Sequence, residues 1–279
     1  MLHIGTLRFP SPSVMGILNV TPDSFSDGGQ FVDIDTARRQ AERMAKDGAV
    51  IIDIGGESTR PGADSVSESQ ELDRVIPVIE AMRDTTALPI SIDTSKPGVM
   101  REAVSSGAAI INDILALQEP GAIETAVELG IPVCLMHMQG RPRTMQGSPH
   151  YDDVALEVCA FLGDRVSSCV AAGIARENII VDPGFGFGKT HAHNVELLAN
   201  LRQLQDLELP VLVGLSRKST LGELTGRDVF DRLPGSISAA VVAVMKGAQI
   251  VRAHDVRETV DALKVVSAVM EASGTIEND

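Results

Sequence analysis

A short apolar run followed by a helix-like pattern recurs eight times along this chain, and that repetition limits its possible folds most. The runs, predicted as buried strands, cover residues 15–18, 49–55, 89–93, 108–112, 131–137, 179–182, 211–215 and 250–253. Each run precedes apolar residues with helical spacing. Strands that alternate with helices form right-handed βαβ crossovers, so the sequence predicts a parallel sheet.

The number of these units favours a closed barrel. Eight units in 279 residues match an α/β fold of the (β/α)8 TIM barrel type, and no linker divides it, so we predict one domain over residues 1–279. The loose alternation over residues 2–9 predicts a short N-terminal β-hairpin that closes one end. The competing fold is an open doubly wound sheet, but the GxGxxG motif that would favour it is missing after the first strand.

Composition and charge exclude several classes of protein. Hydrophobic residues make up 44% of the chain but aromatic residues only 3%, which suits an aliphatic core of parallel strands. A formal net charge of −14 argues against a nucleic-acid partner. Residues 1–10 lack a signal-peptide pattern and no apolar run could span a bilayer, so we expect a cytoplasmic protein with no membrane partner. Three cysteines without CxxC spacing predict buried free thiols.

Local signals predict where several helices begin and end. Ser67 and Gln70 form a predicted capping box, and Pro77 inside the following pattern is expected to kink the helix or to mark its true start. Apolar spacing over residues 195–204 predicts another helix. Asp255 is predicted to cap the final helix.

Two long polar segments follow the first two strands. The first belongs to the stretch MGILNVTPDSFSDGG at residues 15–29, and the second covers residues 56–65. Loops of this length inside a compact domain usually act as lids or binding loops. We therefore expect the functional site at the end of the barrel where these segments lie.

Chemically active side chains stand at the carboxyl ends of the predicted strands, the face where the catalytic residues of such barrels gather. They are Asn19, Asp53, Glu57, Arg60, Asp93, Asn112, His137, Asp182, Arg217, Lys218, Arg252 and His254. Any single aspartate at a strand end often only caps the next helix. Convergence from so many strands, however, predicts one site.

Three of these residues suit a flat heterocycle. Asp93, Asn112 and Asp182 offer a donor and several acceptors, which match an amino-pyrimidinone edge. For Asp182, the alternative to ligand binding is that its side chain caps the next helix. Asn112 and Asp113 must point to opposite faces of a strand, so we expect one to bind ligand and the other to cap a turn.

A second group suits an anion. Arg252 and His254 are two residues apart and share a face, and together with Asn19 they would bind phosphate oxygens. For His254 the alternative is a surface histidine without a ligand. The Asn19 side chain is a suitable oxygen ligand for Mg²⁺ on a diphosphate, and because one protein ligand is a poor site, the metal must arrive with the substrate.

Two glycine- or cation-rich loops complete the pattern. Residues 216–219 run from a strand into a helix start, where free N–H groups attract a carboxylate. Residues 185–189 look like part of a dinucleotide loop, but they lack its full fingerprint and the acidic residue expected about twenty positions later, so we reject that interpretation.

The motifs MGILNVTPDSFSDGG, IIDIGGESTRPGA, ISIDTSKP, IINDI, VCLMHMQG, VDPGFGFGK, LVGLSRKS and IVRAHDV resemble those of the dihydropteroate synthase family, in the same order and from about residue 14 to residue 270. The resemblance implies a homodimeric barrel that acts as a transferase in folate biosynthesis. The family's enzymes join a (7,8-dihydropterin-6-yl)methyl diphosphate to 4-aminobenzoate with Mg²⁺, and they are sulfonamide targets.

The resemblance also implies roles for individual residues. Catalysis would involve Asp93, Lys218, Arg252 and His254. The pterin would contact Asp93, Asn112, Asp182, Phe187 and Lys218, and the diphosphate would contact Asn19, Thr59, Arg252 and His254, with Asn19 facing the metal. The 4-aminobenzoate would lie beside Phe25, Arg60, Pro61 and Ser219. Leu115 departs from the pattern, since many relatives carry a polar or basic residue there.

The expected reaction is a dissociative substitution. The aromatic amine is neutral at pH 7, so a strong base is not needed, and charge neutralisation makes diphosphate a good leaving group. One rival is a methyltransferase of the pterin-binding barrel type, which would have no use for Asn19, Arg252 and His254. A second rival is an inactive pterin-binding module. Release of diphosphate only in the presence of both substrates distinguishes the three.

Overall fold

The computed structural model describes residues 1–21, 34–58 and 65–274, so Phe25, Thr59, Arg60 and Pro61 lie outside the described residues. Eight parallel strands pair in the order β8-β7-β6-β5-β4-β3-β10-β9, and a parallel bridge between Val181 and Val211 joins the two ends of this row. The strands are β3 (Ser13–Asn19), β4 (Ile51–Gly55), β5 (Ile90–Asp93), β6 (Ile110–Asp113), β7 (Val133–Met136), β8 (Ile179–Asp182), β9 (Leu212–Val213) and β10 (Ile250–Ala253). The predicted barrel is confirmed.

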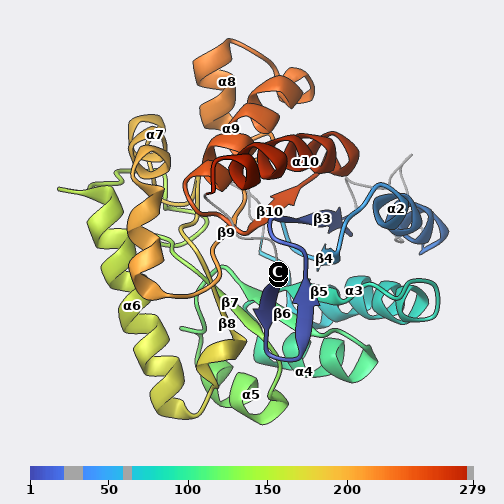
Figure 1. Ribbon diagram of the computed structural model, residues 1–279. Coiled ribbons are helices and arrows are strands. Elements are labelled where there is room, and N and C mark those ends of the chain that lie inside the picture. Colours follow the sequence, from blue (N-terminus) through green and yellow to red (C-terminus); the bar gives the residue numbers. More distant parts are fainter. Residues whose placement is uncertain (22–33, 59–64, 275–279) are drawn as a thin grey trace.

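Helices form a ring around these strands (Figure 1). They are α2 (Ile34–Lys46), α3 (Glu68–Arg83), α4 (Pro97–Ser106), α5 (Ala122–Leu129), α6 (Val154–Ala172), α7 (His191–Ala199), α8 (Ser219–Thr225), α9 (Leu233–Met245) and α10 (Val256–Ala272), with 3₁₀ turns η1 (Arg176–Asn178), η2 (Leu201–Leu207) and η3 (Val229–Asp231). The predicted capping box of Ser67 and Gln70 is present at the start of α3. None of the helices in the described parts of the chain is long and apolar enough to cross a membrane.

Two local predictions need correction, and a third is narrowed. Of the two alternatives for Pro77, the start of the helix is excluded, because α3 begins at Glu68 and continues past this residue. The helix predicted over residues 195–204 is interrupted at Asn200, whose side chain donates to Glu196 O at 3.0 Å and competes with the backbone ladder. Asp255 precedes α10 without a capping hydrogen bond, since its carboxylate is engaged by Arg217.

The lower end of the barrel interior is apolar. Seven inward-facing residues form the lower layer, namely Met15, Ile51, Ile110, Cys134, Ile180, Leu212 and Ile250. They belong to one buried cluster together with Leu2, Ile4 and Phe9. The last three belong to a hairpin of β1 (Leu2–Ile4) and β2 (Leu7–Phe9), which lies over the centre of the ring in Figure 1. The predicted hairpin is confirmed, and it seals this end of the barrel.

The opposite end of the interior is polar. Side chains alternate between the two faces of a strand, so the residue two positions further along points inward again. The next inward-facing residues toward the carboxyl ends of the strands form the upper layer, namely Asp53, Asp93, Asn112, Asp182 and Arg252. The residues that alternate with them along each strand, such as Ile52 and Ile54, point outward and pack against the helices. On β4, β6, β8 and β10 the interior thus changes from apolar to polar along the strand, whereas β7 stays apolar from Cys134 to Met136.

Candidate active site

A half-buried arginine lies at the centre of the upper layer. Arg252 Nε is 2.6 Å from Asp53 Oδ2, and Arg252 Nη2 is 2.8 Å from Asp93 Oδ2. Asn112 Nδ2 donates to the same Asp53 oxygen at 3.1 Å. Burial alone would lower the pKa of Arg252, but the two carboxylates raise it, so the guanidinium stays charged. The network unites four strands that are distant in the sequence.

The carboxylates of this network are not equivalent. Burial raises the pKa of Asp93 to about 7, against the attraction of Arg252. Asp53 is fully buried, and its Oδ1 has no hydrogen-bond partner among the described residues. A buried acceptor without a partner is costly, so this oxygen is available to a donor on a ligand. Asp53 is therefore a site residue to which sequence reasoning assigned no role, although a charged residue between two isoleucines in a buried strand signals a need for a partner.

Asp182 and Lys218 lie on the neighbouring side of the interior. Burial raises the pKa of Asp182 to about 6, and its Oδ1 accepts from Gly184 N at 2.7 Å. Burial and the nearby Arg252 lower the pKa of Lys218 to about 8. The Lys218 ammonium lies 4.2 Å from the centroid of the Phe187 ring, a cation–π contact.

Phe187 belongs to an apolar wall beside these charges. It forms a buried cluster with Met136, Met138 and Met145, and Leu115 packs against that cluster. The departure at Leu115 therefore enlarges an apolar wall. Such a surface suits the face of a flat ring, while the upper layer offers polar partners to its edge.

The pair Asn112 and Asp113 behaves as the strand pattern predicts. Asn112 points inward to Asp53, whereas Asp113 accepts from Leu115 N and Leu117 N, both at 2.8 Å. Asp113 caps the turn that follows β6. The expectation that one residue caps a turn is confirmed, and it leaves Asn112 as the residue that faces the interior.

His254 stands just after β10 and is held by Ser216. Its Nδ1 lies 3.0 Å from Ser216 Oγ, and its backbone N–H donates to that same oxygen at 3.3 Å. Burial lowers the pKa of His254 to about 4, and the cations Arg252 and Arg217 act in the same direction. The imidazole is therefore neutral at pH 7 and has an N–H to offer to an anion.

An ion pair connects the loop after β9 with the start of α10. Arg217 Nε and Nη2 donate to the two oxygens of Asp255 at 3.0 and 2.5 Å. Arg217 adopts a φ of 58°, an uncommon conformation outside glycine. The pair anchors the loop that leads to Lys218 and to Ser219, which begins α8. Sequence reasoning missed this contact because it read Asp255 as a helix cap.

Asn19 and Asp93 flank a glycine on β4. In the parallel register Asn19 pairs with Gly55, and Gly55 pairs with Asp93. A Cβ on Gly55 would lie 3.5 Å from Asp93 Cβ and 3.7 Å from Asn19 Oδ1, so both side chains border the same space. Within the described residues there is no cluster of three His, Cys, Asp or Glu side chains that could hold a metal.

A charged cluster lies at the edge of the site. Lys96 Nζ forms ion pairs with Glu57 and with the buried Glu71. Glu57 Oε1 also accepts from Val66 N at 3.2 Å, so it connects the two described ends of the segment that contains residues 59–64. Glu57 therefore supports the site without reaching its centre.

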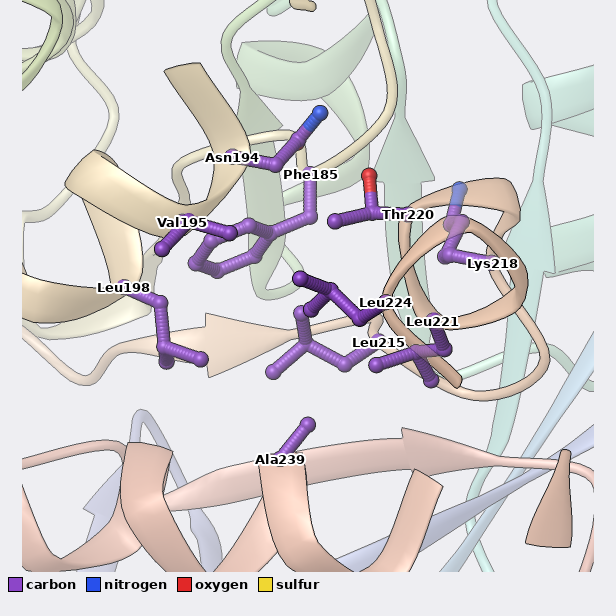
Figure 2. Close-up of a pocket in the computed structure, with 10 residues that line it drawn as sticks. All are labelled: Phe185, Asn194, Val195, Leu198, Leu215, Lys218, Thr220, Leu221, Leu224 and Ala239. Atoms are coloured by element: carbon purple, nitrogen blue, oxygen red, sulfur yellow. The ribbon is translucent and has the colours of Figure 1, made fainter. Parts of the chain in front are cut away.

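A small apolar cavity lies beside the site (Figure 2). Phe185 points into it between Val195 and Leu215, and of the lining side chains only Asn194, Lys218 and Thr220 are polar. It lies outward of the upper layer, between α7 and α8. Its lining lacks the matched donors and acceptors that a polar heterocycle needs.

The structure thus brings most of the predicted residues together. Asn19, Asp93, Asn112, Asp182, Phe187, Lys218, Ser219, Arg252 and His254 all lie at the carboxyl end of the barrel. Phe25, Thr59, Arg60 and Pro61 fall outside the described residues. The arrangement combines polar groups for a heterocycle edge, an apolar wall for its face, and cations for an anionic leaving group.

Comparison with known proteins agrees with this reading. A model of the pterin-binding enzyme family matches residues 15–254. The dihydropteroate synthase of Haemophilus influenzae is 56% identical over 261 residues, which cover 94% of this chain and 95% of that protein. The dihydropteroate synthase of Escherichia coli K12 is 55% identical over 267 residues, covering 96% and 95%.

Solved structures of such enzymes superpose closely. The Yersinia pestis dihydropteroate synthase in a sulfonamide drug complex has a TM-score of 0.92 at 54% identity, covering 96% of this chain and 98% of that one. The Xanthomonas albilineans dihydropteroate synthase in complex with 7,8-dihydropteroate has a TM-score of 0.86 at 49% identity, covering 95% of each. The chain therefore belongs to the dihydropteroate synthase family of pterin-binding enzymes.

Proposed function

We propose that this chain condenses (7,8-dihydropterin-6-yl)methyl diphosphate with 4-aminobenzoate to give 7,8-dihydropteroate and diphosphate. The observation that carries the proposal is the upper layer, in which Arg252 is bound between Asp53 and Asp93 beside Asn112 and Asp182. The test is release of diphosphate by purified protein. Release should require both substrates, and release without 4-aminobenzoate would indicate a simple hydrolase.

The pterin edge needs acceptors for its N–H groups and donors for its carbonyl oxygen. Asp182 and the unpartnered Asp53 Oδ1 supply acceptors, while Asn112 and Lys218 supply donors. The ring face would lie against the wall that contains Phe187. This assignment gives Asp53 Oδ1 a partner that it lacks among the described residues.

The departing diphosphate would lie toward Asn19, Arg252 and His254, with Thr59 as a further contact. Arg252 has N–H groups beyond the two that bind carboxylates, and neutral His254 donates one more. The bond between the pterin methylene carbon and the diphosphate oxygen breaks, and its electron pair leaves with the diphosphate. The amine nitrogen then bonds that carbon and releases a proton to solvent.

One feature of the site and one of the substrate suit a dissociative course. Asp93 in its ionised form would stabilise positive charge on the pterin-methyl group. The amine of 4-aminobenzoate is neutral at pH 7, so attack does not require a base. Ser219 would border the aminobenzoate together with Phe25, Arg60 and Pro61.

The residues present fit a magnesium ion that arrives with the diphosphate. The Asn19 amide oxygen and the Asp93 carboxylate border one space, and both are hard oxygen donors. Asn19 would be the protein ligand. When bound, Mg²⁺ neutralises charge on the leaving diphosphate. The test is calorimetric titration of diphosphate into the protein with and without Mg²⁺, corrected for the same titrations without protein, and binding should be tighter with Mg²⁺.

We also propose that the chain forms a homodimer in the cytoplasm. Four apolar side chains are partly exposed on the adjacent helices α9 and α10, namely Val242, Met245, Val265 and Val269. Val265→Glu should shift the protein toward monomer in analytical ultracentrifugation.

The three unpaired cysteines, two of them buried, support a reducing compartment.

A further inference from the structure

One buried lysine, Lys189, has no part in the chemistry above. Its side chain is only 2% exposed. Its Nζ lies 2.9 Å from Gly184 O, 3.1 Å from Phe187 O and 2.9 Å from His137 Nδ1. An ammonium group has three N–H donors and no acceptor, so these contacts use its whole capacity.

We propose that Lys189 is a positioning residue that clamps the loop of residues 183–188, so that Phe187 keeps Lys218 in place for the pterin. The inference rests on the proposed function and deepens it. It concerns the pterin half of the site rather than the aminobenzoate half.

The loop needs such a clamp because it has no regular ladder of its own. Gly184, Gly186 and Gly188 have φ values of 67°, 83° and 60°. A Cβ on Gly184 would lie 1.8 Å from His137 O, and one on Gly188 would lie 2.3 Å from Gln139 O. The loop therefore lies directly on the backbone that follows β7, and only glycine allows this approach.

Backbone groups of the loop are satisfied by side chains from several elements. Tyr151 Oη donates to Gly188 O at 2.8 Å, and Gln146 Nε2 donates to Gly186 O at 2.6 Å. Asn194 Oδ1 accepts from Gly186 N at 2.7 Å. Lys189 differs from these residues, because it binds two loop carbonyls and also reaches His137 on the opposite segment.

The placement of Lys189 is costly without its three acceptors. A buried charge is strongly unfavourable unless it is hydrogen-bonded, and burial lowers the pKa of Lys189 to about 7. Burial and the adjacent Lys189 lower the pKa of His137 to about 3. A neutral imidazole protonated on Nε2 leaves Nδ1 free to accept. Lys189 Nζ is thus the donor and His137 Nδ1 the acceptor of their hydrogen bond.

The clamp reaches the pterin site through two short contacts. The carbonyl that Lys189 binds belongs to Phe187, whose ring centroid is 4.2 Å from Lys218 Nζ. A Cβ on Gly186 would lie 3.2 Å from Lys218 Cδ, so the loop backbone borders the same side chain. Release of the loop would therefore free both the aromatic ring and the lysine that faces the pterin.

The test compares Lys189→Met with Lys246→Met. Methionine keeps an unbranched apolar chain but removes the three donors. Lys246 is a matched control, since its Nζ donates to Ala199 O at 2.8 Å outside the site. At pH 6, below the pKa of Lys189, the KM for the pterin diphosphate in Lys189→Met should rise about tenfold or more, which corresponds to one lost charged contact. The KM for 4-aminobenzoate should stay within about twofold, and Lys246→Met should match wild type.

Hydrogen exchange of the amides of residues 184–188 supplies a second readout and should be faster in Lys189→Met. An unchanged pterin KM, or an equal rise in both KM values, would overturn the proposal. If Lys189→Met does not fold, His137→Phe removes the acceptor and keeps the ring beside Phe161. A wild-type pterin KM in that variant would also overturn the proposal.

Failure of the proposed function would look different. The wild-type protein would then release no diphosphate with both substrates. Calorimetric titration of 6-hydroxymethylpterin would still test the clamp, because it needs no turnover. Weaker binding to Lys189→Met than to wild type would support the clamp, and equal binding or none would overturn it.

Discussion

The lower and upper layers of the barrel are built by the same strands, yet their chemistry is opposite. Ile110 and Asn112 are two residues apart on β6, as are Ile250 and Arg252 on β10. Two residues of a strand span only about 7 Å. The first layer contributes burial of apolar surface, while the second holds buried charges that oppose folding unless they are paired. On β6 and β10, stability and chemistry are therefore separated along the strand.

This difference explains the position of the hairpin. The side chains of Leu2, Ile4 and Phe9 join the lower layer and exclude water from it. The upper layer has no such cover among the described residues, and Asp53 Oδ1 has no hydrogen-bond partner among them. The upper end therefore offers polar groups to a ligand, whereas the hairpin closes the lower end. Four variants test the comparison, from the largest expected effect to the smallest.

A charge in the lower layer should have the largest effect. Ile110→Asp places a carboxylate without a partner in a fully buried apolar cluster, so we expect a loss of about 4 kcal/mol or more in the free energy of unfolding. Urea unfolding measures it. Ile110→Val is the control and should lose only about 1 kcal/mol. A folded aspartate variant of normal stability would show that the lower layer is not sealed.

Loss of the cation in the upper layer should come next. Arg252→Met leaves Asp53 and Asp93 together without their partner, which should lower the free energy of unfolding by about 3 kcal/mol at pH 8. The loss should be smaller at pH 5, because Asp93 then takes up a proton and relieves the repulsion.

Diphosphate binding to Arg252→Met should also be lost, while affinity for a pterin analogue stays closer to normal. Arg101→Met is the control, since Arg101 forms an exposed pair with Glu128 at 3.1 Å. Exposed pairs contribute only about 0–1 kcal/mol. Equal losses in the two variants would mean that burial does not distinguish the upper layer.

The pH dependence of Asp182 should give an intermediate effect. Burial raises its pKa from 3.8 to about 6 in the folded protein, so the folded state binds this proton more tightly than the unfolded state. The protonated Asp182 therefore stabilises the folded state fully below about pH 4, and this stabilisation is lost as the pH rises through about 6. Between these values wild type should lose about 2 kcal/mol relative to Asp182→Asn. Urea unfolding measures the free energy of unfolding of both proteins from pH 4 to pH 7. A difference between them that stays constant over this range would contradict the prediction.

The smallest effect is expected for Asn112→Ala. The variant removes one hydrogen bond to Asp53, so stability should fall by about 1 kcal/mol. Affinity for a pterin analogue should fall by about 1–3 kcal/mol, because the pterin edge also loses its partner. Calorimetry of both quantities checks the prediction, with the exposed Asn200→Ala as control. A change in stability without a change in affinity would make Asn112 a purely structural residue.

Sequence reasoning succeeded where neighbours along the chain decide the structure. The capping box of Ser67 and Gln70 and the hairpin at residues 2–9 depend on local spacing and are both present. The prediction that either Asn112 or Asp113 caps a turn also holds, and the structure assigns the cap to Asp113. It failed where a distant group competes for a side chain. Asp255 would have been a cap, but Arg217, 38 residues earlier, binds its carboxylate.

The sequence by itself determined the number of strands, their order along the chain and the side chains that face the interior, because side-chain direction alternates with a period of two. Only the tertiary structure decided the partners. Arg252 reaches Asp53, 199 residues away, past the intervening strand β3, and Lys189 reaches His137, 52 residues away. Such pairs depend on ring closure, strand stagger and the length of each side chain. Spacing along a chain carries none of that information.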